Sequence, residues 1–143
     1  MRACVVALGL ALLAAAPGRA QVPADSVAAT IVALERAAMD RSEAADGGEA
    51  FLQLSADDVV YMDPTLEKPI HGLAGLKTYY RSLPRMAPAP HGPMVNVQVQ
   101  AVGEVAVLTY NYVGQRNWNV TEVYRRGDHG WRIIHSHFSY VKP

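Results

Sequence analysis

Four β-rich segments with very short connections fill the C-terminal part of the chain, and they restrict its fold more than any other feature. β-branched and aromatic residues dominate each segment, and the connections carry the glycines that tight turns need. Segments joined this closely pair as antiparallel neighbours. The sequence therefore predicts a four-stranded antiparallel meander, with strands at residues 95–102, 105–113, 118–126 and 131–141.

The part of the chain before the meander has a helical pattern. Asp25 or Ser26 can cap a first helix, which is expected to run to about Asp46 because Gly47-Gly48 stops it. Helices followed by a long antiparallel sheet define an α+β fold in which the helices cover one face of the sheet. Apolar residues recur in the first helix at intervals of three and four: Val27, Ile31, Leu34 and Ala38. Further helical turns, a short strand, a loop and a second helix follow at 50–54, 59–62, 65–72 and 73–83.

Both alternating faces of the last predicted strand are apolar or aromatic. Two helices cannot cover both faces of the sheet, so one apolar face is left without a partner. We therefore expect a homodimer, or a higher oligomer, built through the outer face of the sheet. Strict alternation assigns Trp131, Ile133, His135 and His137 to one face of this strand and Ile134, Phe138 and Tyr140 to the other.

The first 20 residues have the three parts of a secretory signal peptide. Arg2 supplies a positive charge, and residues 3–16 are all small or apolar. Gly18 and Ala20 are small residues that precede a cleavage site ahead of Gln21. A membrane-spanning helix would need about 20 apolar residues, and a buried N-terminal helix is the other alternative. We expect residues 1–20 to be removed and residues 21–143 to form one exported domain, periplasmic or secreted.

Charge and cysteine content exclude several classes of protein. The chain has 13 basic and 13 acidic side chains, and loss of Arg2 and Arg19 with the signal leaves 11 against 13. Such a chain has no basic field to attract nucleic acid or an anionic membrane, so neither is expected as a partner. Cys4 is the one cysteine and leaves with the signal, which excludes disulfides, thiolate nucleophiles and cysteine metal sites.

The order of elements and several local strings resemble a known superfamily. The strings include Tyr61-Met62-Asp63-Pro64, Gly72 opening the helix at 73–80, and Gly103-Glu104-Val105-Ala106-Val107. The most specific string has Trp131, His135, His137 and Ser139 in the spacing W-x-x-x-H-x-H-x-S. On these residues the chain resembles the NTF2-like superfamily, in particular SnoaL-like domains of the DUF4440 type. It is also similar to the association (hub) domain of calcium/calmodulin-dependent protein kinase II.

The resemblance implies an NTF2-like (cystatin-like) cone, in which a curved antiparallel sheet wraps around the N-terminal helices and leaves a pocket. It also implies self-association, since homodimers are common in the superfamily and the kinase hub forms rings. Arginines that hold a carboxylate in the hub correspond here to Asn111, Glu122 and Phe138. Loss of these guanidinium groups removes the basis for binding an anion. We therefore expect Asn111, Glu122, Tyr124 and Phe138 to bind a small apolar or mixed organic ligand.

Six aromatic side chains on three of the predicted strands support the same expectation. They can be core and dimer packing, or they can line an apolar pocket with phenol groups at its polar end. Both interpretations can hold for different rings. The six are Tyr110, Tyr112, Trp118, Tyr124, Phe138 and Tyr140.

Asp63 and Tyr61 are the candidate catalytic residues, because they are two positions apart and project from one face of a strand. Related isomerases and cyclases are expected to use an acidic residue inside the cone, where loss of water near aromatic rings would raise its pKa. The alternative is that Asp63, directly before Pro64, only caps the turn that ends the strand.

The histidines give only weak evidence for a metal site. His135 and His137 share a predicted strand face, but a zinc site would need a third protein ligand, and the resemblance assigns this pair a structural role. His71, His91 and His129 fall in loops or turns. We expect no metal site and no cofactor.

Three functions remain open at this point. The first is an assembly or ligand-binding domain without catalysis. The second is a proton-transfer enzyme of the ketosteroid isomerase, polyketide cyclase or dehydratase type that uses Asp63. The third is a structural subunit whose own side chains fill the cone.

Overall fold

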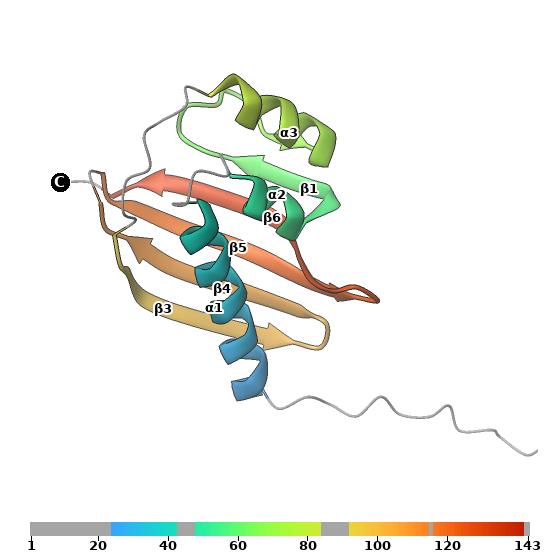
Figure 1. Cartoon of the computed structure of the whole chain (residues 1–143). Coiled ribbons are helices and arrows are strands. Elements are labelled where there is room, and N and C mark those ends of the chain that lie inside the picture. The colour runs from blue at the N-terminus through green and yellow to red at the C-terminus, as the bar shows by residue number, and fades with distance from the viewer. Residues whose placement is uncertain (1–23, 43–47, 84–91, 115, 142–143) are drawn as a thin grey trace, which may run out of the picture.

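The computed structural model describes residues 24–42, 48–83, 92–114 and 116–141, so the predicted signal peptide lies outside the described residues. The described residues form three helices and six strands (Figure 1). The helices are α1 (Ala24–Arg41), α2 (Glu49–Leu54) and α3 (Leu73–Ser82). The strands are β1 (Ser55–Met62), β2 (Ile70–His71), β3 (Met94–Val102), β4 (Val105–Tyr112), β5 (Trp118–Gly127) and β6 (Gly130–Tyr140).

The strands form one sheet in the order β2-β1-β6-β5-β4-β3. β3 to β6 pair as consecutive antiparallel neighbours, which confirms the predicted meander. β1 pairs with β6 in parallel and with β2 antiparallel, so the complete sheet is mixed and not purely antiparallel. Residues 65–72 were expected to be a loop, but Ile70 and His71 pair with β1 and extend the sheet by one short strand.

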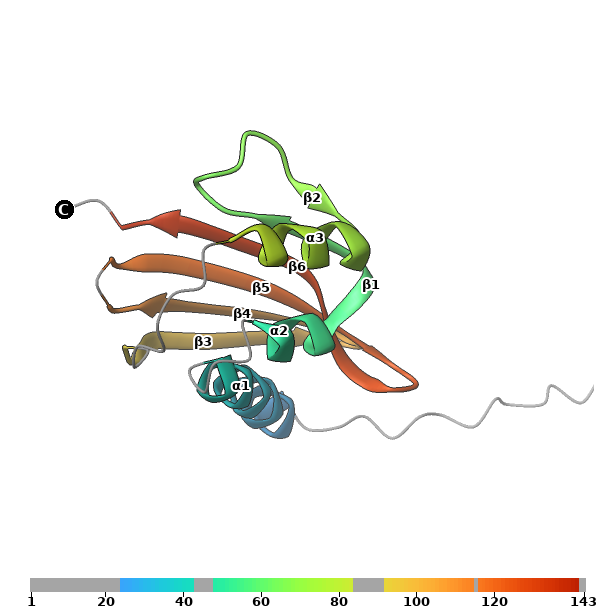
Figure 2. The same cartoon turned by 45° about the horizontal axis from the view of Figure 1, so that its top comes forward.

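All three helices lie on the same face of the curved sheet, and the opposite face carries none of the described helices (Figures 1 and 2). α1 packs across β3 and β4, α2 contacts β1 and β6, and α3 contacts β1 and β2. The core lies between these layers and includes Ile31 of α1, Leu76 of α3, and Leu108 and Ile133 of the sheet. No helix in the described ranges is long and apolar enough to cross a membrane. The α+β architecture with helices on one face is therefore confirmed.

An irregularity in β6 changes which of its residues face the helices. Val123 of β5 pairs with His135, whereas the next residue, Tyr124, pairs with Ile133, so Ile134 is the extra residue of a β-bulge. Strict alternation, which placed Ile133 and His135 on one face, is therefore wrong across this point. After the bulge, Ser136 and Phe138 face the helices together with Ile133.

Candidate functional site

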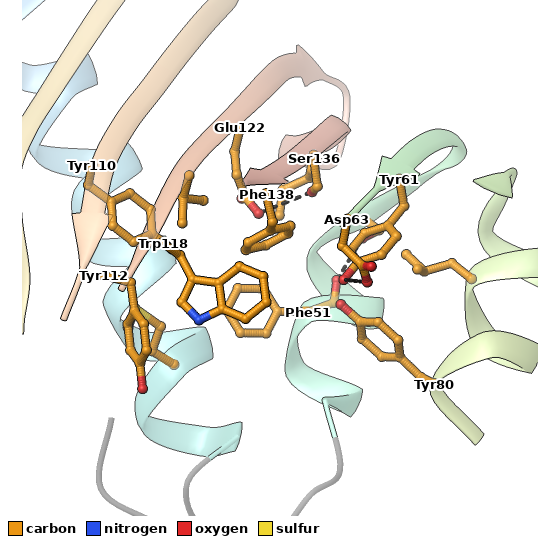
Figure 3. Close-up of a pocket in the computed structure, with 15 residues that line it drawn as sticks. Phe51, Tyr61, Asp63, Tyr80, Tyr110, Tyr112, Trp118, Glu122, Ser136 and Phe138 are labelled. Carbon is orange, nitrogen blue, oxygen red and sulfur yellow. Dashed lines mark hydrogen bonds between the residues drawn. The ribbon is translucent and has the colours of Figure 1, made fainter. Parts of the chain in front are cut away.

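A cavity of about 280 Å³ lies between the helices and the sheet (Figure 3). The largest group of residues in its wall is aromatic: Phe51, Tyr61, Tyr80, Tyr110, Tyr112, Trp118 and Phe138. The aliphatic part consists of Met39, Leu76, Val120 and Ile133, and the polar part of Ser55, Asp63, Glu122 and Ser136. Pockets of this kind, mostly apolar with a few convergent polar groups, are typical of small-molecule sites. The described residues do not fill the cone.

The rings on the β1 side of the cavity hold one another in place. Tyr61 is the centre of this group, with its ring centroid 5.7 Å from Tyr79, 5.8 Å from Tyr80 and 5.6 Å from Phe138. Phe138 in turn meets Trp118 edge to face at 6.3 Å. Tilted and edge-to-face contacts at these distances are favourable and fix ring orientations. The aromatic wall is therefore built before any ligand arrives.

Asp63 lies at the end of β1, is buried, and accepts four hydrogen bonds. Its Oδ1 accepts from the backbone N–H of Thr65 at 2.7 Å and from the Thr65 hydroxyl at 2.6 Å. Its Oδ2 accepts from the hydroxyls of Tyr79 at 2.7 Å and Tyr61 at 3.1 Å. The bond to the Thr65 amide forms the turn that ends the strand, as the capping interpretation predicted.

These hydrogen bonds determine the charge of Asp63. Burial alone would raise the pKa of the carboxyl, but hydrogen bonds from Thr65 and the two phenols outweigh burial and lower that pKa. The expectation of a raised pKa was therefore wrong, because it allowed for aromatic surroundings but not for four donors. Asp63 is a stable carboxylate beside the cavity, and its lone pairs are already occupied.

Two further carboxyl groups lie close together, where the sheet forms the wall of the cavity. Glu35 of α1 and Glu122 of β5 have exposed fractions of only 0% and 1%. Glu35 accepts hydrogen bonds from the hydroxyls of Tyr110, at 2.7 Å, and Tyr124. Glu122 accepts from the Ser136 hydroxyl at 3.1 Å, and its other oxygen lies 3.2 Å from the Tyr124 hydroxyl. Of the two carboxyls, Glu122 is the one that lines the cavity.

The geometry of this cluster puts a proton on Glu122. Burial and the neighbouring charge of Glu35 raise the pKa of Glu122 well above its usual value, and the hydrogen bond that Ser136 donates opposes this by less. The phenol of Tyr124 has one proton, which its short bond to Glu35 uses. Contact between that phenol and Glu122 is therefore a hydrogen bond only when Glu122 donates. The cavity thus has a neutral acid on one side and a carboxylate on the other.

The structure separates the residues predicted to form the site. Asp63, Tyr61, Glu122 and Phe138 line one cavity, and Tyr124 lies behind its wall in the Glu35 cluster. Asn111 does not line it, because its neighbours Tyr110 and Tyr112 face inward and strand alternation turns Asn111 to the outer face. The structure therefore places Asn111 outside the cavity, apart from the other residues predicted to bind a ligand. Its side chain belongs to a ladder across the outer face, in which Asn96 donates to Asn111, Asn111 to Asn119, and Asn119 to Ser139.

Sequence reasoning missed Glu35, although the sequence carried a signal for it. Glu35 follows Ile31 by four residues and precedes Ala38 by three, so it occupies the buried stripe of α1. An ionisable residue in an apolar stripe is rarely buried without a partner. Its partners come from β4 and β5, more than 70 residues away, and the sequence does not identify them.

His135 and His137 lie on the outer face of β6, away from the cavity. His135 pairs with Val60 and Val123 in the sheet, and His137 pairs with Met62 and Thr121. Burial, with a smaller contribution from His137, lowers the pKa of His135. Within the described ranges, no group of three or more His, Cys, Asp and Glu residues could hold a metal ion.

Comparisons with known proteins agree with this fold. The sequence profile of the SnoaL-like domain matches residues 28–143, and the chain belongs to this family. A candidate ketosteroid isomerase from Parabacteroides distasonis has 43% identity and a TM-score of 0.71, covering 79% of this chain and 86% of its own. No curated protein sequence matches the chain.

Two less similar structures share the fold. A candidate dehydratase of the NTF2-like family from Streptomyces avermitilis has 20% identity, a TM-score of 0.69, and coverage of 83% of this chain and 99% of its own. The CaMKII hub homology domain of Chlamydomonas reinhardtii has 22% identity and a TM-score of 0.62, with coverage of 81% and 99%. The predicted NTF2-like fold is therefore confirmed.

Proposed function

We propose that the protein binds a small organic molecule in the aromatic cavity. The observation that carries this proposal is the cavity itself, about 280 Å³ of open space lined by seven aromatic side chains with two carboxyl groups at its wall. A structural subunit would have filled this space with its own side chains, since cavities cost stability. The volume is at the small end of the range for ligand pockets, which favours a compact ligand.

A filled-cavity variant tests this proposal. Val120 is 2% exposed, lines the cavity, and precedes Glu122 by two positions on the same strand face. Val120→Phe should occupy part of the space and abolish binding of small aromatic probes that the unchanged protein binds in an NMR titration. Val102→Phe, at an exposed position at the end of β3 away from the cavity, is the control and should leave binding unchanged. Equal affinity of both variants for the probes would contradict binding in this cavity.

Proton transfer is the second candidate function, and Glu122 favours it. Pairs of titratable groups whose surroundings push their pKa values apart are typical of acid–base sites, and here Glu122 is a neutral acid while Asp63 is a carboxylate. The relatives named as a candidate ketosteroid isomerase and a candidate dehydratase support the same chemistry. In this version Glu122 donates its proton to a hydroxyl oxygen of the substrate, and water leaves as the C–O bond breaks. The resulting Glu122 carboxylate then takes a proton from the neighbouring carbon, which forms the double bond and restores the acid. Asp63 stabilises the positive charge that develops on carbon and does not take this proton, because its lone pairs are occupied.

Dehydration of 1-phenylethanol to styrene, a reaction of a compact substrate, tests this second candidate. Glu122→Gln keeps the shape of the protonated acid but cannot release a proton, so turnover should fall by at least about 100-fold, the usual contribution of a general acid. Asp63→Asn should reduce turnover less than Glu122→Gln does. If the unchanged protein shows no turnover, or if Glu122→Gln turns over the substrate equally fast, the proposed proton transfer is wrong and only ligand binding remains.

We also propose that the outer face of the sheet forms a homodimer or a higher oligomer. Val107, Val123, His135 and Val60 form a continuous row across four neighbouring strands, and each is half-buried in the single chain. Val123→Lys would put a charge in this row and should convert the protein to a monomer in light scattering. Val102→Lys, at a position 82% exposed near the end of β3, is the control that should keep the oligomer.

Export is proposed from the first 20 residues, which lie outside the described ranges. The mature chain would begin at Gln21. Mass spectrometry of the protein from the periplasm or medium of a Gram-negative host should give the mass of residues 21–143. Recovery of the complete chain, Met1 included, from the cytoplasm alone would contradict the proposal.

A further inference from the structure

One negative charge lines the cavity and a second lies behind its wall. Asp63 contributes the first, and Glu35, whose charge helps to raise the pKa of neutral Glu122, contributes the second. Among the described residues that line the cavity there is no Lys, Arg or His. An anionic ligand would meet like charge without a compensating donor, and it is disfavoured on this ground.

The carboxylate of Asp63 acts through its charge and not as a hydrogen-bond acceptor. Its two oxygens already accept four hydrogen bonds, from Thr65, Tyr61 and Tyr79. A primary ammonium group needs acceptors for its three N–H groups and would lose them on entering this site. A cation without N–H groups loses no hydrogen bonds there and still gains the attraction of the charge.

The aromatic wall supplies the other half of such a site. Faces of Tyr, Trp and Phe attract cations that lie within about 6 Å of the ring centroid, most strongly where water is excluded. Tyr61 donates its hydroxyl proton to Asp63, which adds electron density to its ring. A ring at the edge of this aromatic group already binds a cation, since the guanidinium of Arg116 lies 5.2 Å from the centroid of Tyr140, and Tyr140 packs against Trp118 at 4.7 Å.

We infer that the ligand of the cavity is a weakly hydrated organic cation, namely a quaternary or fully substituted ammonium compound with an apolar or aromatic substituent. The inference rests on the proposed binding function and names the chemical class of its ligand. Rings of the wall surround the ammonium methyl groups, Asp63 and the Glu35–Glu122 pair supply the opposite charge, and the substituent fills the apolar remainder of the cavity.

Three probes of similar size test this inference with the purified full chain. Benzyltrimethylammonium is the cation, neopentylbenzene is its uncharged isostere with carbon in place of nitrogen, and phenylacetate is the anion. NMR titration gives a Kd for each. The cation should bind at least about tenfold more tightly than the isostere, which corresponds to about 1.4 kcal/mol. Phenylacetate should show no binding.

A charge-neutral variant identifies the source of the preference. Asp63→Asn keeps the size of the side chain and should reduce affinity for the cation by about tenfold, while affinity for neopentylbenzene stays within about twofold. Unchanged affinity for the isostere also shows that the variant folds with its cavity intact. Asp128→Asn, an exposed residue in the turn between β5 and β6, removes the same charge and should change neither affinity.

Each other outcome has a definite meaning. Equal or tighter binding of neopentylbenzene or phenylacetate overturns the cation inference but leaves the cavity as a binding site. Failure of all three probes overturns the proposed binding function and the inference with it. If Asp63→Asn loses affinity for the cation and for the isostere equally, Asp63 shapes the cavity. Its charge then does not cause the preference for a cation, and the inference is overturned.

Discussion

The hydroxyl of Tyr124 lies between the carboxyl groups of Glu35 and Glu122, donating to the first and 3.2 Å from an oxygen of the second. One side chain of β5 thereby connects helix α1 to a residue two positions away on its own strand. The arrangement needs a proton on Glu122, and burial beside Glu35 raises the pKa of Glu122 in the required direction. The cluster therefore joins the helical layer to the sheet and also sets the protonation state of the cavity wall.

Loss of the Tyr124 hydroxyl should destabilise the fold. Tyr124→Phe removes one of the two phenols that donate to Glu35 and leaves the proton of Glu122 without its acceptor, and an unsatisfied buried group costs about 1–3 kcal/mol. Urea unfolding measures the change in the free energy of unfolding. Tyr140→Phe is the control, since Tyr140 is 40% exposed and its hydroxyl accepts a hydrogen bond from exposed Arg116. Equal losses in the two variants would contradict the importance of the buried cluster.

Stability should decrease as pH rises, in the window set by Glu122. The folded state holds the proton of Glu122 more tightly than the unfolded state does. The contribution of this proton to the free energy of unfolding is therefore complete below the ordinary Glu pKa of 4.5 and is lost as pH rises toward the raised folded value. The slope approaches about 1.4 kcal/mol per pH unit within this window. Glu122→Gln keeps a neutral side chain at every pH, and its urea unfolding curves should lose this slope. A variant with the slope of the unchanged protein would place the proton elsewhere.

Asp63 should show the opposite pH dependence. Its folded pKa is lowered, so the stability that it contributes is present above 3.8 and is lost as pH falls through the folded value. Tyr79→Phe removes one of the lowering hydrogen bonds and should move the pKa of Asp63 up toward 3.8, as read from an NMR titration of its carboxyl carbon. Tyr112→Phe removes a cavity phenol that does not bond to Asp63, and the pKa should stay where it was. A shift of the same size in both variants would show a general effect of the cavity instead.

Local patterns predicted much of the fold, because meander strands, turn glycines and helix stripes all act over a few residues. Pairing of β1 with β6 joins segments some 75 residues apart, and neither strand shows this partner in its own sequence. The bulge at Ile134 was equally hidden, and it is the reason that Ser136 and Phe138 reach the cavity. Within the site, Asp63 was found because it follows Tyr61 by two, whereas its pKa depends on hydrogen bonds from Thr65, in the turn that follows, and from Tyr79, which comes from α3.

Gly48 provides a test of how tightly the cavity wall is built. Its φ is 84°, and a Cβ at this position would lie 2.8 Å from Cδ2 of the Tyr80 ring, which lines the cavity. Gly103 has a φ of 58°, and a Cβ there would meet nothing within 4 Å. The variant Gly103→Ala therefore measures the cost of the backbone conformation alone. In both alanine variants the free energy of unfolding should fall by about 1–2 kcal/mol, because alanine is strained in the left-handed backbone conformation. Gly48→Ala should lose about 1–3 kcal/mol more, because the ring must move. Because the Tyr80 ring is displaced, Gly48→Ala should also bind benzyltrimethylammonium more weakly, whereas Gly103→Ala should bind it as the unchanged protein does. Equal stability and equal affinity of the two variants would mean that Tyr80 moves freely and does not define the wall.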